Sequence, residues 1–187
     1  MNDWRSQAGQ ASGITLDAMF RRAFSLHAGR TAVTWTEGRR SYAELGDRAW
    51  RLANALHELG YRRGDTLAVL SETRPEYIEC YAALAALGIT AATLNVRLHP
   101  AELAACLRKC GPVGLLVSDT LAPIATKLRA DAPEIRHWIS FGPAEGFDDY
   151  ESLLRASHPA EPPRIAQGSD IHNILFTSGT TGQPKGA

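Results

Sequence analysis

The chain has 187 residues, of which 44% are hydrophobic and 21% charged, and its 20 Lys plus Arg balance its 20 Asp plus Glu. This length and composition are typical of a globular chain with one domain core and exclude a disordered one. Because the net charge is zero, the overall charge does not indicate a nucleic acid or an anionic membrane as partner. The three cysteines include no CxxC pair, which argues against a disulfide scaffold or structural zinc and favours a cytoplasmic protein. No stretch approaches the roughly 20 strongly apolar residues of a membrane span.

Residues 1–62 are predicted to form a helix–strand–helix region. Apolar periodicity predicts a helix over 15–27, a strand over 31–36 and a second helix that ends at Leu59, before Gly60. Ser41 and Glu44 have the spacing of a capping box, in which each residue caps the other, so the second helix is expected to begin there.

Residues 63–157 show a regular alternation of short apolar runs and helical segments. Strands are predicted over 66–70, 89–94, 113–117 and 136–141. Helices are predicted over 77–87, from Pro100 to about Cys110, from Ser118-Asp119 to before Pro133, and over 149–156. The strands are rich in Val and Leu and lack polar alternation, which is typical of a parallel sheet. The predicted fold class is therefore α/β, with layered βαβ units and a mainly parallel sheet covered by helices.

The last part of the chain differs in composition from everything before it. Three prolines within 158–163 predict a linker over 158–170. In the segment 171–187, a buried-type strand over 171–176 leads directly into the loop Thr177–Gly186, TSGTTGQPKG. The glycines of this loop let backbone amides approach a ligand, its hydroxyls donate hydrogen bonds and its lysine is positively charged. The loop therefore suits a polyphosphate.

This loop does not fit the Walker P-loop pattern GxxxxGK[ST]. When Lys185 is aligned with the Walker lysine, Pro184 takes the place of the second glycine and Gly186 that of the Ser or Thr. A flexible polar loop after an edge strand is the alternative interpretation, and the lysine, the proline and the preceding strand disfavour it.

The loop resembles the phosphate-binding signature of the adenylate-forming superfamily, which includes acyl- and aryl-CoA synthetases, firefly-luciferase-type enzymes and nonribosomal peptide adenylation domains. Upstream segments resemble the same family: 31–33, 41–45, 63–69, and 95–103, the last in the form common in fatty-acyl-type CoA synthetases. Asp170 matches an acidic residue usual seven positions before the first threonine of the signature. His172 departs from the small residue that the family often has there.

The resemblance implies that residues 1–187 are an N-terminal fragment of an AMP-binding (adenylation) domain, with an incomplete fold, most like that of fatty-acyl-CoA synthetases. The family joins a carboxylic acid to ATP as an acyl-adenylate, with Mg²⁺, and then forms a thioester with coenzyme A. The residues implied to hold the β- and γ-phosphates are Thr177, Ser178, Gly179, Thr180, Thr181, Gly182, Lys185 and Gly186. No catalytic residue is assigned within this chain.

The same resemblance implies that this fragment binds phosphate or nucleotide weakly and is inactive as a ligase. The alternative is a non-catalytic, stand-alone module that binds a nucleotide or a partner protein. If the chain is an isolated fragment, exposed sheet edges are expected to favour self-association, whereas a monodisperse monomer would favour the stand-alone module.

Two other groups of residues receive structural interpretations. The arginine pairs 21–22, 39–40 and 62–63 are expected to be solvated surface rather than a nucleic-acid stripe. Cys106 and Cys110, four residues apart with His99 nearby, are expected to be buried small side chains rather than a metal site.

Overall fold

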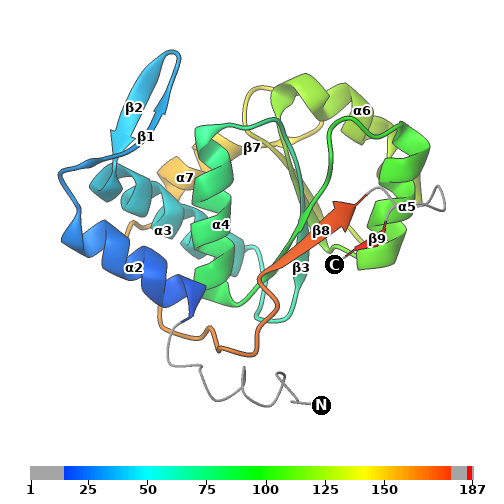
Figure 1. The fold of residues 1–187 in the computed structure, drawn as a ribbon. Coiled ribbons are helices and arrows are strands. Elements are labelled where there is room, and N and C mark those ends of the chain that lie inside the picture. Colours follow the sequence, from blue (N-terminus) through cyan, green and yellow to red (C-terminus); the bar gives the residue numbers. More distant parts are fainter. Residues whose placement is uncertain (1–14, 178–184, 187) are drawn as a thin grey trace.

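The computed structural model describes residues 15–177 and 185–186. It contains a seven-stranded sheet with helices on both faces and a separate two-stranded hairpin (Figure 1). The helices are α2 (Leu16–Leu26), α3 (Tyr42–Glu58), α4 (Pro75–Leu87), α5 (Pro100–Cys110), α6 (Ala122–Lys127) and α7 (Tyr150–Ala156). The strands are β1 (Thr31–Trp35), β2 (Gly38–Ser41), β3 (Thr66–Leu70), β4 (Thr90–Thr93), β5 (Gly114–Val117), β6 (His137–Ser140), β7 (Asp148–Asp149), β8 (Asn173–Thr177) and β9 (Lys185–Gly186).

The large sheet has the strand order β7-β6-β5-β3-β4-β8-β9. Its neighbouring strands run parallel from β7 to β8, and β9 pairs antiparallel with β8. In the centre, Thr66 of β3 pairs with Thr90 of β4, and Leu67 pairs with Gly114 of β5. The predicted α/β class with a mainly parallel sheet is confirmed.

The central strand β3 is buried on both faces, which explains its uninterrupted apolar sequence. Leu67 and Val69 pack into the cluster formed with α3, α4 and α7, whereas Ala68 and Leu70 pack into the cluster formed with α5 and α6. Figure 1 shows these two groups of helices on opposite sides of the sheet. Successive strand residues point to opposite faces, so a strand with two covered faces needs apolar residues at every position.

The helix ends follow the local signals in the sequence. The Glu44 amide donates to Ser41 Oγ at 3.2 Å and the Ser41 amide donates to Glu44 Oε2 at 2.7 Å, so the predicted capping box is confirmed. Pro75 lies in the first turn of α4, where a missing N–H is tolerated. The same helix ends at Gly88, whose φ of +63° lies in the left-handed region that favours glycine.

The segment after β5 differs from the single helix predicted from Ser118. It forms a 3₁₀ turn at Asp119–Leu121, the short helix α6 and a second 3₁₀ turn at Arg129–Asp131. Ser118 Oγ lies 3.0 Å from Thr120 Oγ1 and makes no side-chain cap. Pro123 accounts for the break, because its ring cannot continue a helix from the preceding turn and instead starts α6.

Strands β2 and β7 are not in the sequence prediction. β2 pairs antiparallel with β1 and contains Gly38, Arg39 and Arg40, and β7 consists of two aspartates beside β6. Neither segment has an apolar alternation that would indicate a strand.

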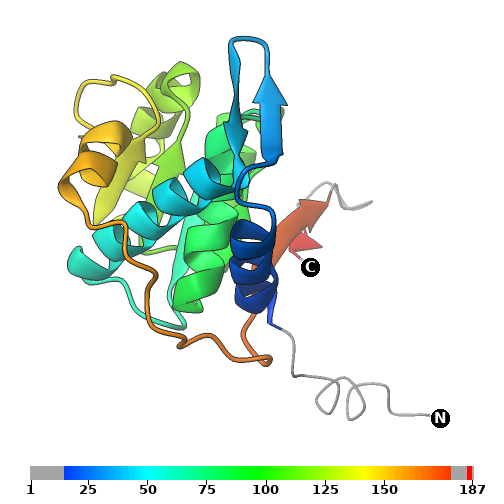
Figure 2. The same cartoon turned by 90° about the vertical axis from the view of Figure 1, so that its left-hand side faces the viewer.

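The predicted linker 158–170 forms no helix or strand, and Figure 2 shows it crossing from α7 to β8. Side chains of α3 hold its start in place. Asn54 Nδ2 donates to the carbonyls of His158 at 2.6 Å and Ala160 at 2.9 Å. The segment is therefore attached to the domain along α3 rather than standing away from it.

Candidate functional site

The candidate phosphate loop begins where β8 ends, at the carboxyl edge of the parallel strands. Thr177 pairs with Lys185, and Phe176 pairs with Gly186, across the antiparallel β8–β9 ladder. The backbone on either side of residues 178–184 is thus held together at one place. Of the eight predicted phosphate-binding residues, Ser178, Gly179, Thr180, Thr181 and Gly182 lie outside the described residues, and the role of all eight stays a prediction.

The strand that leads into this loop is less buried than its sequence indicates. Leu175 is 54% exposed and Ile171, just before the strand, is 65% exposed, whereas Phe176 packs against the cluster of α5 and α6. The prediction of a buried-type strand over 171–176 is therefore wrong for one face of β8. An apolar run does not tell which of its faces other elements cover.

An ion pair holds the residues just before β8. Arg63 Nε lies 3.0 Å from Asp170 Oδ1 and 3.0 Å from Oδ2, and Arg63 Nη2 lies 2.5 Å from Oδ1. The Gln167 amide also donates to Asp170 Oδ2, at 2.8 Å. The hydrogen bonds from Arg63 lower the pKa of Asp170. The acidic residue that the resemblance singles out is thus placed away from the loop, at the opposite end of the strand.

His172 directly precedes β8 and is half-buried. Its ring lies 5.6 Å from that of Tyr81 on α4, and burial lowers its pKa. The larger side chain is accommodated by this ring contact, so the departure from the family's small residue leaves the pairing of β8 with β4 intact.

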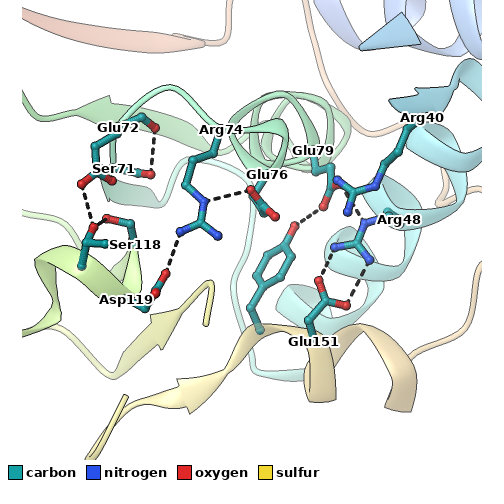
Figure 3. Close-up of polar contacts among 12 residues, drawn as sticks. Arg40, Arg48, Ser71, Glu72, Arg74, Glu76, Glu79, Ser118, Asp119 and Glu151 are labelled. Carbon is teal, nitrogen blue, oxygen red and sulfur yellow. Dashed lines mark hydrogen bonds and ion pairs between the residues drawn. The ribbon is translucent and has the colours of Figure 1, made fainter. Parts of the chain in front are cut away.

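A second polar cluster lies at the carboxyl ends of β3 and β5 (Figure 3). Thr120 Oγ1 donates to Glu72 Oε1 at 2.6 Å, and Arg74 Nη1 donates to Asp119 Oδ1 at 2.6 Å. The chain leaves β3 through α4 on one face of the sheet and leaves β5 through α6 on the other face. Such a switch point is where open α/β sheets bind ligands.

Beside this switch point is a cavity of about 390 Å³ with aromatic walls. Its lining includes Trp35, Tyr77 and Tyr81 together with Ser71 and Arg74. The size falls within the usual range of small-molecule pockets, about 300–1,000 Å³. Sequence reasoning missed this cavity, although two tyrosines four residues apart at the start of a helix are a signal for an aromatic face.

A buried ionic cluster behind this cavity was also missed. The Glu79 carboxylate on α4, which is 0% exposed, accepts from Arg40 Nη1 at 2.8 Å, Arg48 Nε at 2.7 Å and Tyr150 OH at 2.7 Å. Arg48 donates in addition to both oxygens of Glu151, at 3.0 and 2.5 Å (Figure 3). Burial, with the nearby Glu79 charge, raises the pKa of the Tyr150 hydroxyl well above its usual value.

The interpretation of the arginine pairs as solvated surface is wrong for Arg21, whereas Arg40 is partly exposed and Arg63 is exposed although each has a carboxylate partner. Arg21 is buried, lies 2.7 Å from Asp17 and sits over the Trp50 ring. Arg40 reaches Glu79 and Arg63 reaches Asp170. The carboxylate partner of each of these arginines lies on a neighbouring helical turn or on a distant element. The occurrence of two adjacent arginines in the sequence could therefore not identify that partner.

The described residues include no group of three His, Cys, Asp or Glu side chains that could hold a metal ion. Cys106 is buried and Cys110 half-buried, while His99 caps α5, its Nδ1 accepting from the Ala101 amide at 3.4 Å. Among the helices that the structure describes, none is both long and apolar enough to cross a membrane.

Comparisons with known proteins agree with this architecture. Residues 20–187 match the AMP-binding enzyme family. The chain is 33% identical to a long-chain-fatty-acid–CoA ligase of Thermus thermophilus, over 79% of this chain and 27% of that protein. It is 33% identical to an indoleacetate–CoA ligase of Aromatoleum aromaticum, over 93% of this chain and 34% of that protein. The crystal structure of the anthranilate CoA ligase AuaEII in complex with anthranoyl-AMP superposes with a TM-score of 0.86 at 26% identity, covering 92% of this chain and 34% of that one.

The chain therefore spans about a third of the length of the relatives it matches. With its parallel sheet and its TSGTTGQPKG segment, it belongs to the AMP-binding enzyme family and corresponds to an N-terminal portion of the adenylate-forming acyl-CoA ligases.

Proposed function

We propose that this chain supplies the phosphate-binding part of an ATP-dependent acyl-CoA synthetase. The complete enzyme would join a carboxylic acid to ATP as an acyl-adenylate, release pyrophosphate and transfer the acyl group to coenzyme A. Relatives named as CoA ligases for fatty and aryl acids support this reaction class. Because the chain spans only a third of those proteins, the reaction is assigned to the longer protein and not to these residues alone.

The pairing of Thr177 with Lys185 is the observation that carries the proposal. It brings the residues that flank 178–184 together at the carboxyl edge of a parallel sheet, where α/β folds bind ligands. In the proposal, the hydroxyls of this loop and its backbone amides donate to the β- and γ-phosphates. Lys185 balances the charge that grows on the departing pyrophosphate.

The chain alone is proposed to bind phosphate or nucleotide weakly, with ligase activity absent. Mg²⁺ belongs to the complete enzyme in this proposal. The proposed organisation keeps 1–62, 63–157, 158–170 and 171–187 as successive parts of one adenylation domain in a cytoplasmic protein. Exposed Leu175 and Ile171 support self-association of the isolated chain.

Titration of the pure chain with inorganic pyrophosphate and ATP, followed by ³¹P NMR, tests the proposal. Wild type should bind both, and Lys185→Ala should weaken binding at least about tenfold, since a charge-assisted contact contributes about 1.5–3 kcal/mol. Lys127→Ala removes an exposed lysine on α6 and serves as the matched control. Equal binding by both variants would contradict the role of the loop.

A second measurement separates the proposed synthetase fragment from a stand-alone module. The intact mass of the protein from its native gene should be two to three times that of this 20.3 kDa chain if it is part of a synthetase. Carboxylate-dependent pyrophosphate release by the 187-residue chain itself would overturn the expectation that it is inactive.

A further inference from the structure

The register of β8 is weakly specified by its own side chains. Ile174, Leu175 and Phe176 are all apolar, and Leu175 points to an exposed face. A slip of one residue exchanges the two faces of a strand, and a strand with apolar residues on both faces loses less burial in such a slip than one with a polar face. Such a slip would also move the base of the following loop by about 3.3 Å. Something other than the hydrophobic pattern must fix where this strand begins.

The contact of β8 with β4 begins before the strand itself. The strand pairs with β4 over Ala91↔Asn173 to Thr93↔Leu175, the Ala91 amide donates to the His172 carbonyl at 2.9 Å, and Thr90 Oγ1 donates to the Ile171 carbonyl at 2.8 Å. On its other side, β8 contacts only the two residues of β9 among the described strands. The residues immediately before the strand therefore help to fix the position of β8 along β4.

The Arg63–Asp170 pair joins those residues to a fixed part of the fold. Arg63 belongs to the turn that enters β3, and this turn is itself held in place. The Arg62 amide donates to Asp65 Oδ2 at 2.9 Å, and the Gly64 amide donates to the Gly88 carbonyl at 3.0 Å. Asp170 receives the guanidinium from one side and the Gln167 amide from the other. The pair thus ties the entry of β8 to the entry of β3.

On one side, the pair packs against Gly88 at the end of α4. A Cβ added to Gly88 would lie 2.7 Å from Asp170 Oδ2 and 2.8 Å from Arg63 Cγ. The carboxylate therefore rests directly against the backbone at the end of α4. The contact requires glycine at this position, in addition to the left-handed φ of +63°.

We propose that Arg63 and Asp170 are positioning residues that set the register of β8 against β4, and through it the place where Thr177 and Lys185 hold the candidate phosphate loop. The pair touches no substrate. It acts by anchoring one end of a strand whose other end carries the loop. The consequence for phosphate binding rests on the proposed function, whereas the anchoring of β8 does not.

Asp170→Asn in the 187-residue chain tests the proposal, because it keeps the side-chain size and removes the charge. Asp131→Asn is the matched control, since it breaks another exposed arginine pair, with Arg108 at 2.7 Å, away from β8. Hydrogen exchange of the β8 amides should accelerate at least about tenfold in Asp170→Asn, with exchange in β3 unchanged. Pyrophosphate binding, followed by ³¹P NMR, should weaken about fivefold. Neither change should occur in Asp131→Asn.

Charge reversal tests whether the interaction between the two side chains, and not either side chain alone, holds β8 in place. The double variant Arg63→Asp with Asp170→Arg should recover part of the slow exchange in β8 and of the pyrophosphate affinity, because an arginine at 170 cannot accept from the Gln167 amide, whereas each reversal alone should lose more than the double variant. If β8 exchanges alike in Asp170→Asn and in the control, the positioning role is overturned. If wild type binds no pyrophosphate, the proposed phosphate site fails, and the exchange data still decide whether the pair anchors β8.

Discussion

Replacing Glu79 by Gln should destabilise the chain by about 3 kcal/mol. Glu79 is 0% exposed and accepts hydrogen bonds from Arg40, Arg48 and Tyr150, so three donors converge on one carboxylate. Gln keeps the shape but removes the charge and places an amide donor against those donors. Breaking a buried ion pair typically costs about 3–5 kcal/mol. We take the lower end because Arg48 retains Glu151 and both arginines are partly exposed, at 18% and 19%.

Urea unfolding followed by far-UV circular dichroism measures this change directly. In a chain of this size about 3 kcal/mol corresponds to a Tm lower by about 6–12 °C. Tyr150→Phe is the matched control, because it removes one hydrogen bond to the same carboxylate and leaves every charge in place. It should cost about 1.5–2 kcal/mol, as expected for a hydrogen bond to a charged group.

A Glu79→Gln variant within 1 kcal/mol of wild type would refute this reasoning. It would mean that the arginines are satisfied by water and that the cluster behaves as solvated surface. A double variant with Arg40→Ala distinguishes the two cases. If Arg40 and Glu79 interact, the cost of both changes together should be clearly smaller than the sum of the single costs.

Three other predictions concern the entry of β8 and the thiols. Gly88→Ala should cost at least about 1–2 kcal/mol in urea unfolding, because a left-handed φ strains any other residue and the new Cβ would press on Asp170. In acid, β8 exchange should accelerate in two stages. Burial lowers the pKa of His172, so its contribution is lost below about pH 6.5, and Arg63 lowers that of Asp170, so its contribution is lost below about pH 4. His172→Asn should abolish the first stage only. Burial raises the pKa of Cys110 to about 11, so its thiol should react with a disulfide reagent at neutral pH more slowly in the native chain than in urea.

The sequence predicted the central layer of the fold well for a physical reason. β3 was predicted over the residues that form it, and α5 begins at Pro100 and ends at Cys110 as expected. Both are specified locally, by an uninterrupted apolar run in one case and by a proline start and glycine stop in the other. The capping box of Ser41 and Glu44 is equally local.

What the sequence did not predict depends on partners that are distant along the chain. Glu79 meets Arg40 from 39 residues away, and Asp170 meets Arg63 from 107 residues away. A charged residue at such separation has no periodic signature, so it is indistinguishable in sequence from solvated surface. The exposed face of β8 was missed for a related reason. Its apolar residues resemble those of a central strand, and only the arrangement of neighbouring elements shows that Leu175 is uncovered.

These two ion pairs serve two segments of the fold that are only partly buried. The hairpin of β1 and β2 is a separate two-stranded sheet, and an isolated hairpin is marginally stable in water. Arg40 connects it to Glu79 on α4 and also lies 4.9 Å from the Trp35 ring. β8 is held in the same manner by Asp170 and Arg63. Because hydrophobic packing holds these segments only in part, a directional charged contact adds to it. Removing either contact should therefore loosen its own segment before it affects the central sheet.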